Sequence, residues 1–182
     1  MKDIDIYAAE LFEEAKRFLE KAKDAENEDG KKAFLHAALL LGMSSFEAYL
    51  NAISDEMAER PNLEVLDRSI LLEKEYRFEK GKFKLTKNLK MYNLLDRLTF
   101  IASRFALSRK GLDTSADWWS KINQGIGIRN SLVHPKEKHI INYQQVADAF
   151  EGILGVLDAI YLAIYGQHFP ALGRHLDSKM GF

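Results

Sequence analysis

The sequence of 182 residues contains no cysteine and only three prolines. The absence of cysteine excludes a disulfide framework, a zinc site with thiolate ligands and a cysteine nucleophile. Long apolar runs are also missing, since the longest, Ala37 to Met43, is far below the roughly 20 residues of a membrane-spanning helix. The segment Met1 to Asp5 is acidic and has no apolar signal core. We therefore expect a soluble, cytoplasmic protein without membrane attachment.

Two common functional motifs are missing as well. The five histidines show no paired ligand spacing such as H-E-x-x-H, and no glycine cluster precedes a Lys-Ser or Lys-Thr pair. The first absence argues against a metal hydrolase, and the second argues against a P-loop. We expect neither a metal ion nor another cofactor.

Charge is nearly balanced in total but is unevenly distributed along the chain. Residues 1–67 include 8 basic and 16 acidic residues, residues 68–110 include 12 and 4, and residues 111–182 include 6 and 7. A basic block of this kind indicates an anionic partner. The alternative is that the acidic N-terminal helix packs across the basic segment.

Apolar residues recur at intervals of three and four along most of the chain, which is typical of amphipathic helices. This periodicity predicts long helices over about 5–27, 31–59, 88–110, 115–134 and 143–165, and a short helix over 63–75. Asp29-Gly30 is predicted to form the first turn, and Gly166 is predicted to end the last helix. We expect one domain spanning residues 1–182. Its core over about 3–166 should be an all-α, up-and-down bundle of four to five long helices, followed by a tail over 167–182.

The second predicted helix is the most apolar element, but it carries a polar stripe. The stripe consists of Ser44, Glu47, Asn51 and Ser54, at positions i, i+3, i+7 and i+10. Such a stripe is either the solvent-exposed face of the helix or the lining of a polar cleft. A carboxylate at Glu47 buried in a cleft would need a cationic partner.

A short segment between the helices follows a different periodicity. Apolar residues alternate on both sides of Lys80-Gly81, which predicts a small β-hairpin over about 76–85. Its polar positions are mostly basic, and they include Arg77, Lys80, Lys82 and Lys84. We interpret this segment as a basic arm inserted between helices.

The end of the fifth long helix brings an arginine, an amide and an imidazole into about one helical turn, at Arg129, Asn130 and His134. Pro135 disfavours the α conformation of the residue before it, so the helix should end at or near His134. Five residues of an ideal helix would separate Arg129 from His134 by about 140°, but fraying at Pro135 would let His134 swing back. A cation pair at a helix end suits binding and cleaving a phosphodiester. Ordinary capping of a helix C-terminus by basic side chains is the alternative.

Two glycines precede this motif on the same predicted helix. Gly125 and Gly127 weaken the helix by about 1 kcal/mol each relative to alanine. Glycines at these positions permit the close approach of another backbone, such as that of a partner subunit.

With this motif on the penultimate long helix and one apolar helix after it, the pattern resembles the HEPN domain (higher eukaryotes and prokaryotes nucleotide-binding). The signature of that family is an arginine, a following polar residue and a histidine a short interval later, and Arg129, Asn130 and His134 match its shortest form. The predicted second helix also resembles the second helix of the family, in which Glu47 matches a polar or acidic position near the motif. The resemblance covers about residues 37–165, and the basic insertion over 73–87 is not assigned to the common core.

The resemblance implies a metal-independent endoribonuclease that acts as a homodimer, in which two copies of the motif form one cleft. Members of this kind are often toxins or antiphage effectors, which implies RNA as substrate and a cognate antitoxin as a further partner. By the same resemblance His134 would be the general acid or base and Arg129 would bind the phosphate. Asn130 would hydrogen-bond the phosphate or orient His134. Glu47 would hold Arg129 in place. The basic arm, through Arg77, Lys80, Lys82 and Lys84, would bind RNA. The alternative is a non-catalytic helical module that dimerises or binds nucleotide or RNA without turnover.

Overall fold

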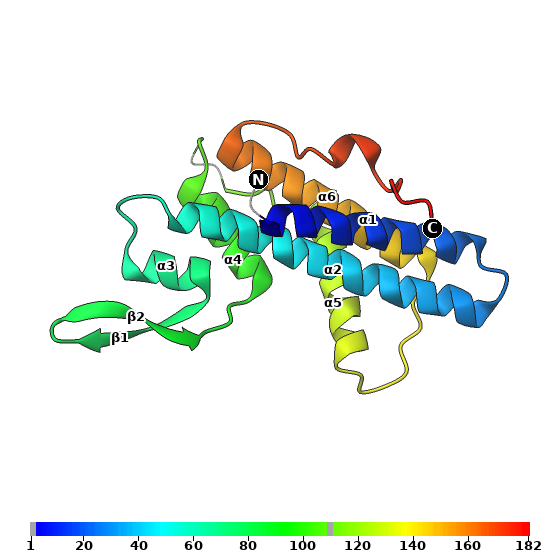
Figure 1. Ribbon diagram of the computed structural model, residues 1–182, viewed down its shortest axis with the longest axis horizontal. Coiled ribbons are helices and arrows are strands. Elements are labelled where there is room, and N and C mark those ends of the chain that lie inside the picture. Colours follow the sequence, from blue (N-terminus) through cyan, green and yellow to red (C-terminus); the bar gives the residue numbers. More distant parts are fainter. Residues whose placement is uncertain (1–2, 109–110) are drawn as a thin grey trace.

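The computed structural model describes residues 3–108 and 111–182, which form six α-helices and one two-stranded hairpin (Figure 1). The elements are α1 (Asp3–Asp24), α2 (Glu28–Ala58), α3 (Val65–Leu72), β1 (Lys74–Glu79), β2 (Lys82–Leu89), α4 (Leu94–Phe105), α5 (Asp117–Val133), α6 (Tyr143–Tyr165) and a short 3-10 turn (Leu172–Arg174). The predicted all-α bundle is confirmed, with five helices of 12 residues or more.

The first two helices lie side by side, and a turn of only three residues separates them (Figure 1). The Asn27 side chain accepts a hydrogen bond of 2.7 Å from the backbone N–H of Gly30, so α2 begins at Glu28. The expected turn at Asp29-Gly30 is therefore wrong by about three residues. Both residues belong to the first turn of α2, where the carboxylate of Asp29 is favoured by the positive end of the helix dipole.

The central helix of the bundle is α2, which contacts all five other helices. Its buried residues surround its axis, as expected for a helix with protein on most sides. By length and composition alone α2 could also cross a membrane, but half of the relevant stretch is buried inside this bundle. Within its polar stripe, Glu47 and Asn51 are partly exposed, whereas Ser54 is buried and its hydroxyl donates to the backbone oxygen of Leu50.

The predicted hairpin is confirmed and is longer than expected. Phe78 lies opposite Phe83, and Lys80 and Gly81 form the turn with φ values of 50° and 77°. Both positive values suit the two-residue turns that match the twist of a hairpin. The hairpin packs on α3, whereas the acidic α1 packs along α2 and α6 (Figure 1). The basic arm is thus supported by α3 and does not pack against the acidic α1.

The longer hairpin delays the start of the next helix. Asn88 and Leu89, predicted to begin that helix, instead end β2, where Leu89 pairs with Lys74 of β1, and α4 begins after Asn93. The Asn93 side chain caps α4 by accepting hydrogen bonds from the N–H groups of Leu95 and Asp96. Strand pairing here outweighs the local helical periodicity. Lys110, the predicted end of this helix, lies outside the described residues.

The last two helices agree closely with the sequence. The fifth, α5, ends at Val133, two residues before Pro135, and α6 spans the predicted Tyr143–Tyr165. Gly166 ends α6 with a φ of 69°, which favours glycine.

Glycines on α6 let its backbone approach the backbone of α5 closely. A Cβ atom at Gly152 would lie 2.5 Å from the backbone nitrogen of Ile122 on α5. Gly125 is also filled from within, because its Cβ would meet Met43 and Ala149. The expectation that Gly125 admits a partner subunit is therefore wrong, whereas Gly127 faces open space.

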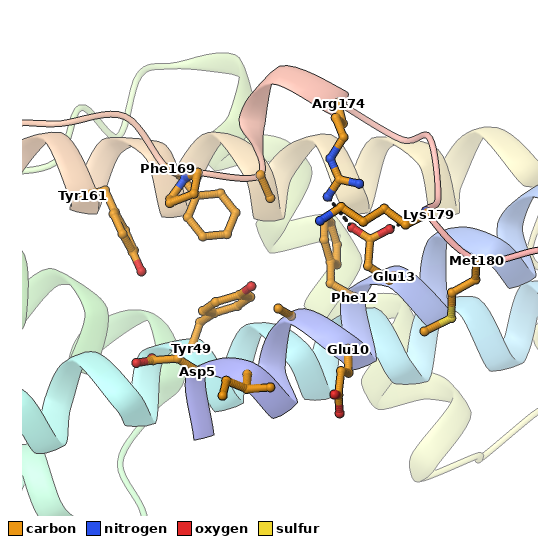
Figure 2. Close-up of a pocket in the computed structure, with 14 residues that line it drawn as sticks. Asp5, Glu10, Phe12, Glu13, Tyr49, Tyr161, Phe169, Arg174, Lys179 and Met180 are labelled. Atoms are coloured by element: carbon orange, nitrogen blue, oxygen red, sulfur yellow. Dashed lines mark hydrogen bonds and ion pairs between the residues drawn. The ribbon is translucent and has the colours of Figure 1, made fainter. Parts of the chain in front are cut away.

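The tail over 167–182, whose structure the sequence did not predict, returns along the bundle and closes a pocket. This pocket of about 510 Å³ lies between α1, α6 and the tail (Figure 2). Its aromatic wall is formed by Tyr49, Tyr161 and Phe169, with both tyrosine rings 5.1 Å from the phenylalanine ring between centroids. Burial raises the pKa of the Tyr49 hydroxyl, and nearby Tyr161, Asp5 and Glu13 raise it further.

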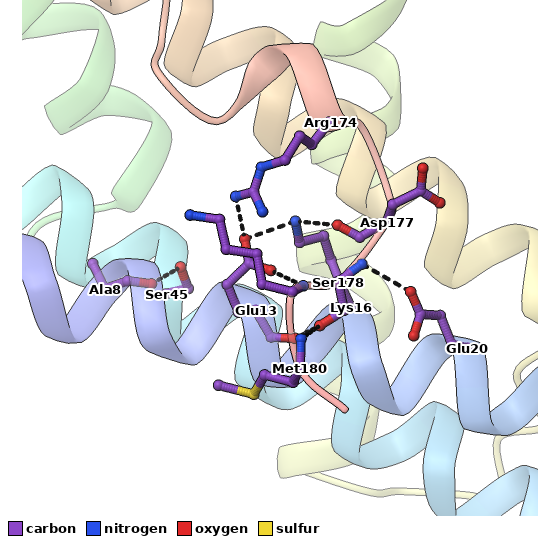
Figure 3. A network of polar contacts seen from close by, with 10 residues as sticks. Ala8, Glu13, Lys16, Glu20, Ser45, Arg174, Asp177, Ser178 and Met180 are labelled. Atoms are coloured by element: carbon purple, nitrogen blue, oxygen red, sulfur yellow. Dashed lines mark hydrogen bonds and ion pairs between the residues drawn. The ribbon is translucent and has the colours of Figure 1, made fainter. Parts of the chain in front are cut away.

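One carboxylate, that of Glu13, fastens the tail to α1 (Figure 3). It pairs with Lys16 at 2.9 Å and with Arg174 at 2.7 Å, and it accepts the backbone N–H of Lys179 at 2.7 Å. The fully buried Lys16 also donates to the backbone oxygen of Asp177. Burial alone would raise the pKa of Glu13, but these hydrogen bonds and charges outweigh it and hold the pKa below its ordinary value.

Candidate functional site

The predicted contact between Glu47 and Arg129 is present. The guanidinium of Arg129, on α5, donates a short hydrogen bond to the carboxylate of Glu47, on α2. Both side chains line a pocket of about 350 Å³ bordered by α2, α4 and α5. Asn51, one helical turn after Glu47, lines the same pocket. The middle of the polar stripe on α2 therefore lines a polar cleft, although Ser44 at its start is exposed.

A second arginine in this pocket was not identified from the sequence. Arg97 is 4% exposed, and its guanidinium donates to Asn51 at 2.7 Å and to the backbone oxygen of Leu71 at 2.8 Å. It also pairs with Glu73 at 3.0 Å. Burial lowers the pKa of Arg97, and the carboxylate of Glu73 opposes that effect. Its place in the sequence could have identified it, because Arg97 falls among the apolar residues of α4 that face α2.

His134 lies at the C-terminal end of α5, and its backbone N–H donates a hydrogen bond of 2.9 Å to the backbone oxygen of Asn130. Its side chain lines a different pocket from Arg129, one of about 520 Å³ that also includes Lys136 and His139. His134 is therefore not among the residues that line the Arg129 pocket, and its predicted return to the side of Arg129 stays a prediction.

Asn130 connects the two pockets, since it lines both of them. The Arg129 pocket contains two arginines and two carboxylates, Glu47 and Glu73. The His134 pocket contains two imidazoles, one lysine and one carboxylate. An anion that spans both would meet a guanidinium on one side of Asn130 and imidazoles on the other.

His139 is a further candidate that sequence reasoning did not select. It shares the pocket of His134, and its Nε2 atom is buried without a hydrogen-bond partner within the described chain. No spacing rule relates it to Arg129, because the irregular segment between α5 and α6 brings it there. Two imidazoles in one pocket offer both a proton acceptor and a proton donor.

The four predicted RNA-binding residues of the arm, Arg77, Lys80, Lys82 and Lys84, are all exposed. Glu79 pairs with two of them, Arg77 at 3.2 Å and Lys84 at 3.7 Å. The arm is connected to the Arg129 pocket through its base, because Met91 and Tyr92, just after β2, line that pocket. The base of the arm therefore borders the Arg129 pocket, whereas its four basic residues line neither that pocket nor the His134 pocket.

The apolar pocket beneath the tail contains none of the predicted site residues (Figure 2). No group of three or more His, Cys, Asp or Glu side chains in residues 3–108 and 111–182 is arranged to hold a metal ion. The side chains around Asn130 carry guanidinium, imidazole, amide, ammonium and carboxylate groups.

Comparison with known proteins identifies a family. Neither a curated protein nor a solved structure matches the chain. Residues 8–166, however, match the model of the family described as RiboL-PSP-HEPN. This match includes every helix that lines the two pockets, and such membership supports a nucleotide- or RNA-related function in general. The chain therefore belongs to the HEPN domain family.

Proposed function

We propose that the protein is a metal-independent endoribonuclease of HEPN type, with its site around Asn130. The single observation that carries this proposal is the placement of an oriented arginine and an exposed histidine on either side of one amide. RNA cleavage by its own 2′-hydroxyl needs little more than charge stabilisation at the phosphate and transfer of two protons.

In the proposed reaction the 2′-oxygen attacks the adjacent phosphorus and the bond from phosphorus to the 5′-oxygen breaks. The products are a 2′,3′-cyclic phosphate and a 5′-hydroxyl. His134 accepts the proton of the 2′-hydroxyl or donates one to the leaving oxygen, and a second imidazole performs the other transfer. Arg129, held by Glu47, stabilises the charge that develops on the phosphate. Asn130 hydrogen-bonds the phosphate between them.

The separation of Arg129 and His134 into two pockets supports a site built from two chains. In a symmetric homodimer with its axis near Asn130, the arginine of one copy would face the histidine of the other. Gly127, which is exposed and has open space around it, lies on the surface that such a contact would use. Light scattering at micromolar concentration tests this step, and a monomer would contradict it.

A second candidate is a module that binds RNA or nucleotide without turnover. It is favoured by the pairing of both arginines in the Arg129 pocket with carboxylates, which reduces the positive charge offered to a phosphate. Within the catalytic proposal, a toxin or defence effector restrained by an antitoxin protein remains the biological role that we propose.

The decisive experiment is a cleavage assay on mixed RNA after treatment with EDTA. Wild-type protein should release products with 2′,3′-cyclic phosphate ends, and His134→Ala should reduce the rate by about 10²–10⁴-fold. The matched control is His175→Ala, which removes an exposed histidine of the tail and should leave the rate unchanged. Circular dichroism should give the same helicity for all three proteins. If His134→Ala cleaves as fast as wild type, His134 is not catalytic, and if no RNA is cleaved, the binding module is the better account.

A further inference from the structure

Aromatic side chains form a continuous row from the Arg129 pocket to the end of the hairpin. The row consists of Tyr92, Tyr76, Phe83 and Phe78. Ring centroids are 5.9 Å apart between Tyr76 and Phe83 and 5.2 Å apart between Phe83 and Phe78. Lys90 joins the first two members, with its Nζ atom 5.1 Å from the Tyr92 ring centroid and 5.3 Å from that of Tyr76.

The hairpin members of this row are exposed rather than buried. Phe78 is 67% exposed, Phe83 58% and Tyr76 36%. Phe78 lies opposite Phe83 and Tyr76 opposite Leu85, so the pairing places all three rings on one face. The hairpin packs on α3 without covering them. Contiguous exposed aromatic surface of this kind marks an interaction site.

The charge around the row identifies the kind of partner. Residues 74–90 contain seven basic and two acidic residues. Arg77 and Lys84 face each other on the side of the hairpin opposite to the rings, and Lys80 lies at the turn. A purely apolar partner would not be attracted by this charge, whereas a polyanion with flat, stackable groups matches both features.

The row also leads directly to the candidate site. Tyr92 lines the Arg129 pocket, and its hydroxyl shares a hydrogen bond of 2.8 Å with Ser69, which fixes the inner end of the row. A strand whose phosphate lies beside Arg129 can therefore continue outward with successive bases against Tyr76, Phe83 and Phe78.

We propose that this aromatic row stacks against the bases of single-stranded RNA on one side of the scissile phosphate, so that the substrate is unpaired RNA read without sequence preference. The proposal rests on the proposed function. Rings bind unpaired bases because their flat faces are free, whereas the bases of a duplex are already stacked on one another. Two cations flank the row itself, Lys90 between Tyr92 and Tyr76 and Lys80 at the turn, and these are placed to hold phosphates of the same strand.

The test is binding of a fluorescein-labelled 12-nucleotide strand with 2′-O-methyl riboses, measured by fluorescence anisotropy. This probe has no free 2′-hydroxyl for attack, so the result does not depend on whether the protein cleaves RNA. The double variant Phe78→Ala, Phe83→Ala should raise Kd by at least about fivefold, the lower end of the effect of losing one stacked base. A strand of the same length without bases should show no difference between wild type and variant.

Two further variants complete the design. Tyr7→Ala removes an aromatic ring of α1 that is 56% exposed and lies outside the row, and it should leave Kd unchanged. Phe78→Trp with Phe83→Trp keeps stacking surface and should bind at least as tightly as wild type. The proposal is overturned if the alanine variant binds the complete strand like wild type, or if it loses the same affinity for the strand without bases. It is also overturned if the alanine substitutions convert a dimer into a monomer in light scattering, because the row is then an interface between copies.

Discussion

Glu47→Ala should damage catalysis far more than stability. The pair is partly exposed, with 24% of the Arg129 side chain and 44% of the Glu47 side chain accessible to solvent. Pairs with such access to water contribute about 0.2–1 kcal/mol. At roughly 2–4 °C per kcal/mol for a chain of this size, the melting temperature should fall by less than about 4 °C. The rate should nevertheless fall by about 10²-fold, the order of loss expected when a charge-stabilising group is misplaced.

The chain offers a matched control for this variant. Lys121 and Glu151 form another pair between two helices, at 2.7 Å, and their side chains are 25% and 46% exposed. Glu151→Ala should therefore cost a similar amount of stability and no activity. Thermal unfolding followed by circular dichroism, together with kcat and KM for RNA cleavage, separates the two effects. Glu47→Gln, which keeps an acceptor for the guanidinium, should lose less of kcat than Glu47→Ala.

Two results would refute this reasoning. If Glu47→Ala unfolds with a loss of several kcal/mol, the pair supports the fold and not the site. If Glu47→Ala and Glu151→Ala cleave RNA equally fast, Glu47 does not position Arg129 for the reaction.

Three other perturbations have defined outcomes. Glu73→Ala should lower the free energy of unfolding in urea by about 3–5 kcal/mol, because it leaves the buried Arg97 without its ionic partner; a loss below 1 kcal/mol would show that this pair is solvated. Neutralising Lys80, Lys82 and Lys84 together should reduce the slope of log affinity on log salt by about 0.7 for each lost phosphate contact with single-stranded RNA, and an unchanged slope would contradict a role in binding. The carboxylate of Glu13 has a lowered pKa in the folded chain, so its stabilising effect is present above its unfolded pKa of about 4.3 and is lost as pH falls through the folded value. Glu13→Gln should accordingly make unfolding less dependent on pH in this acidic range, and identical pH profiles would refute the assignment.

Helical periodicity and turn residues were sufficient to predict the bundle, because α2 and α6 bury long apolar faces and Gly166 and Pro135 act locally. Predictions failed where a distant partner decided the local structure. Leu89 continues the helical spacing of the residues after it, but it pairs with Lys74 of β1, and pairing across a hairpin is not visible in local periodicity. The tail shows no regular spacing of apolar residues. Polar contacts to Glu13 and Lys16 of α1 hold it in place, and a local pattern does not reveal such contacts.

The residues of the candidate site also fall into those that the sequence predicted and those that it did not. Glu47 and Arg129 could be paired from the sequence through the resemblance to the HEPN family, in which a polar or acidic position of the second helix lies near the motif. Arg97 and His139 could not, because their places depend on how α4 packs against α2 and on the irregular segment after Pro135. The aromatic alternation of the hairpin was visible in the sequence, but its exposure was not.

Gly152 links the packing inside the bundle to the geometry of the candidate site. It sets how deeply α5 is seated, because one added methyl group would push against the α5 backbone at Ile122. Arg129 follows Ile122 by seven residues, or about two helical turns, and a helix transmits a displacement along its axis with little bending. A substitution at this buried position would thus act as a remote adjustment of the distance between Arg129 and Glu47. Selection could tune the activity of the domain through a core residue that never meets the substrate.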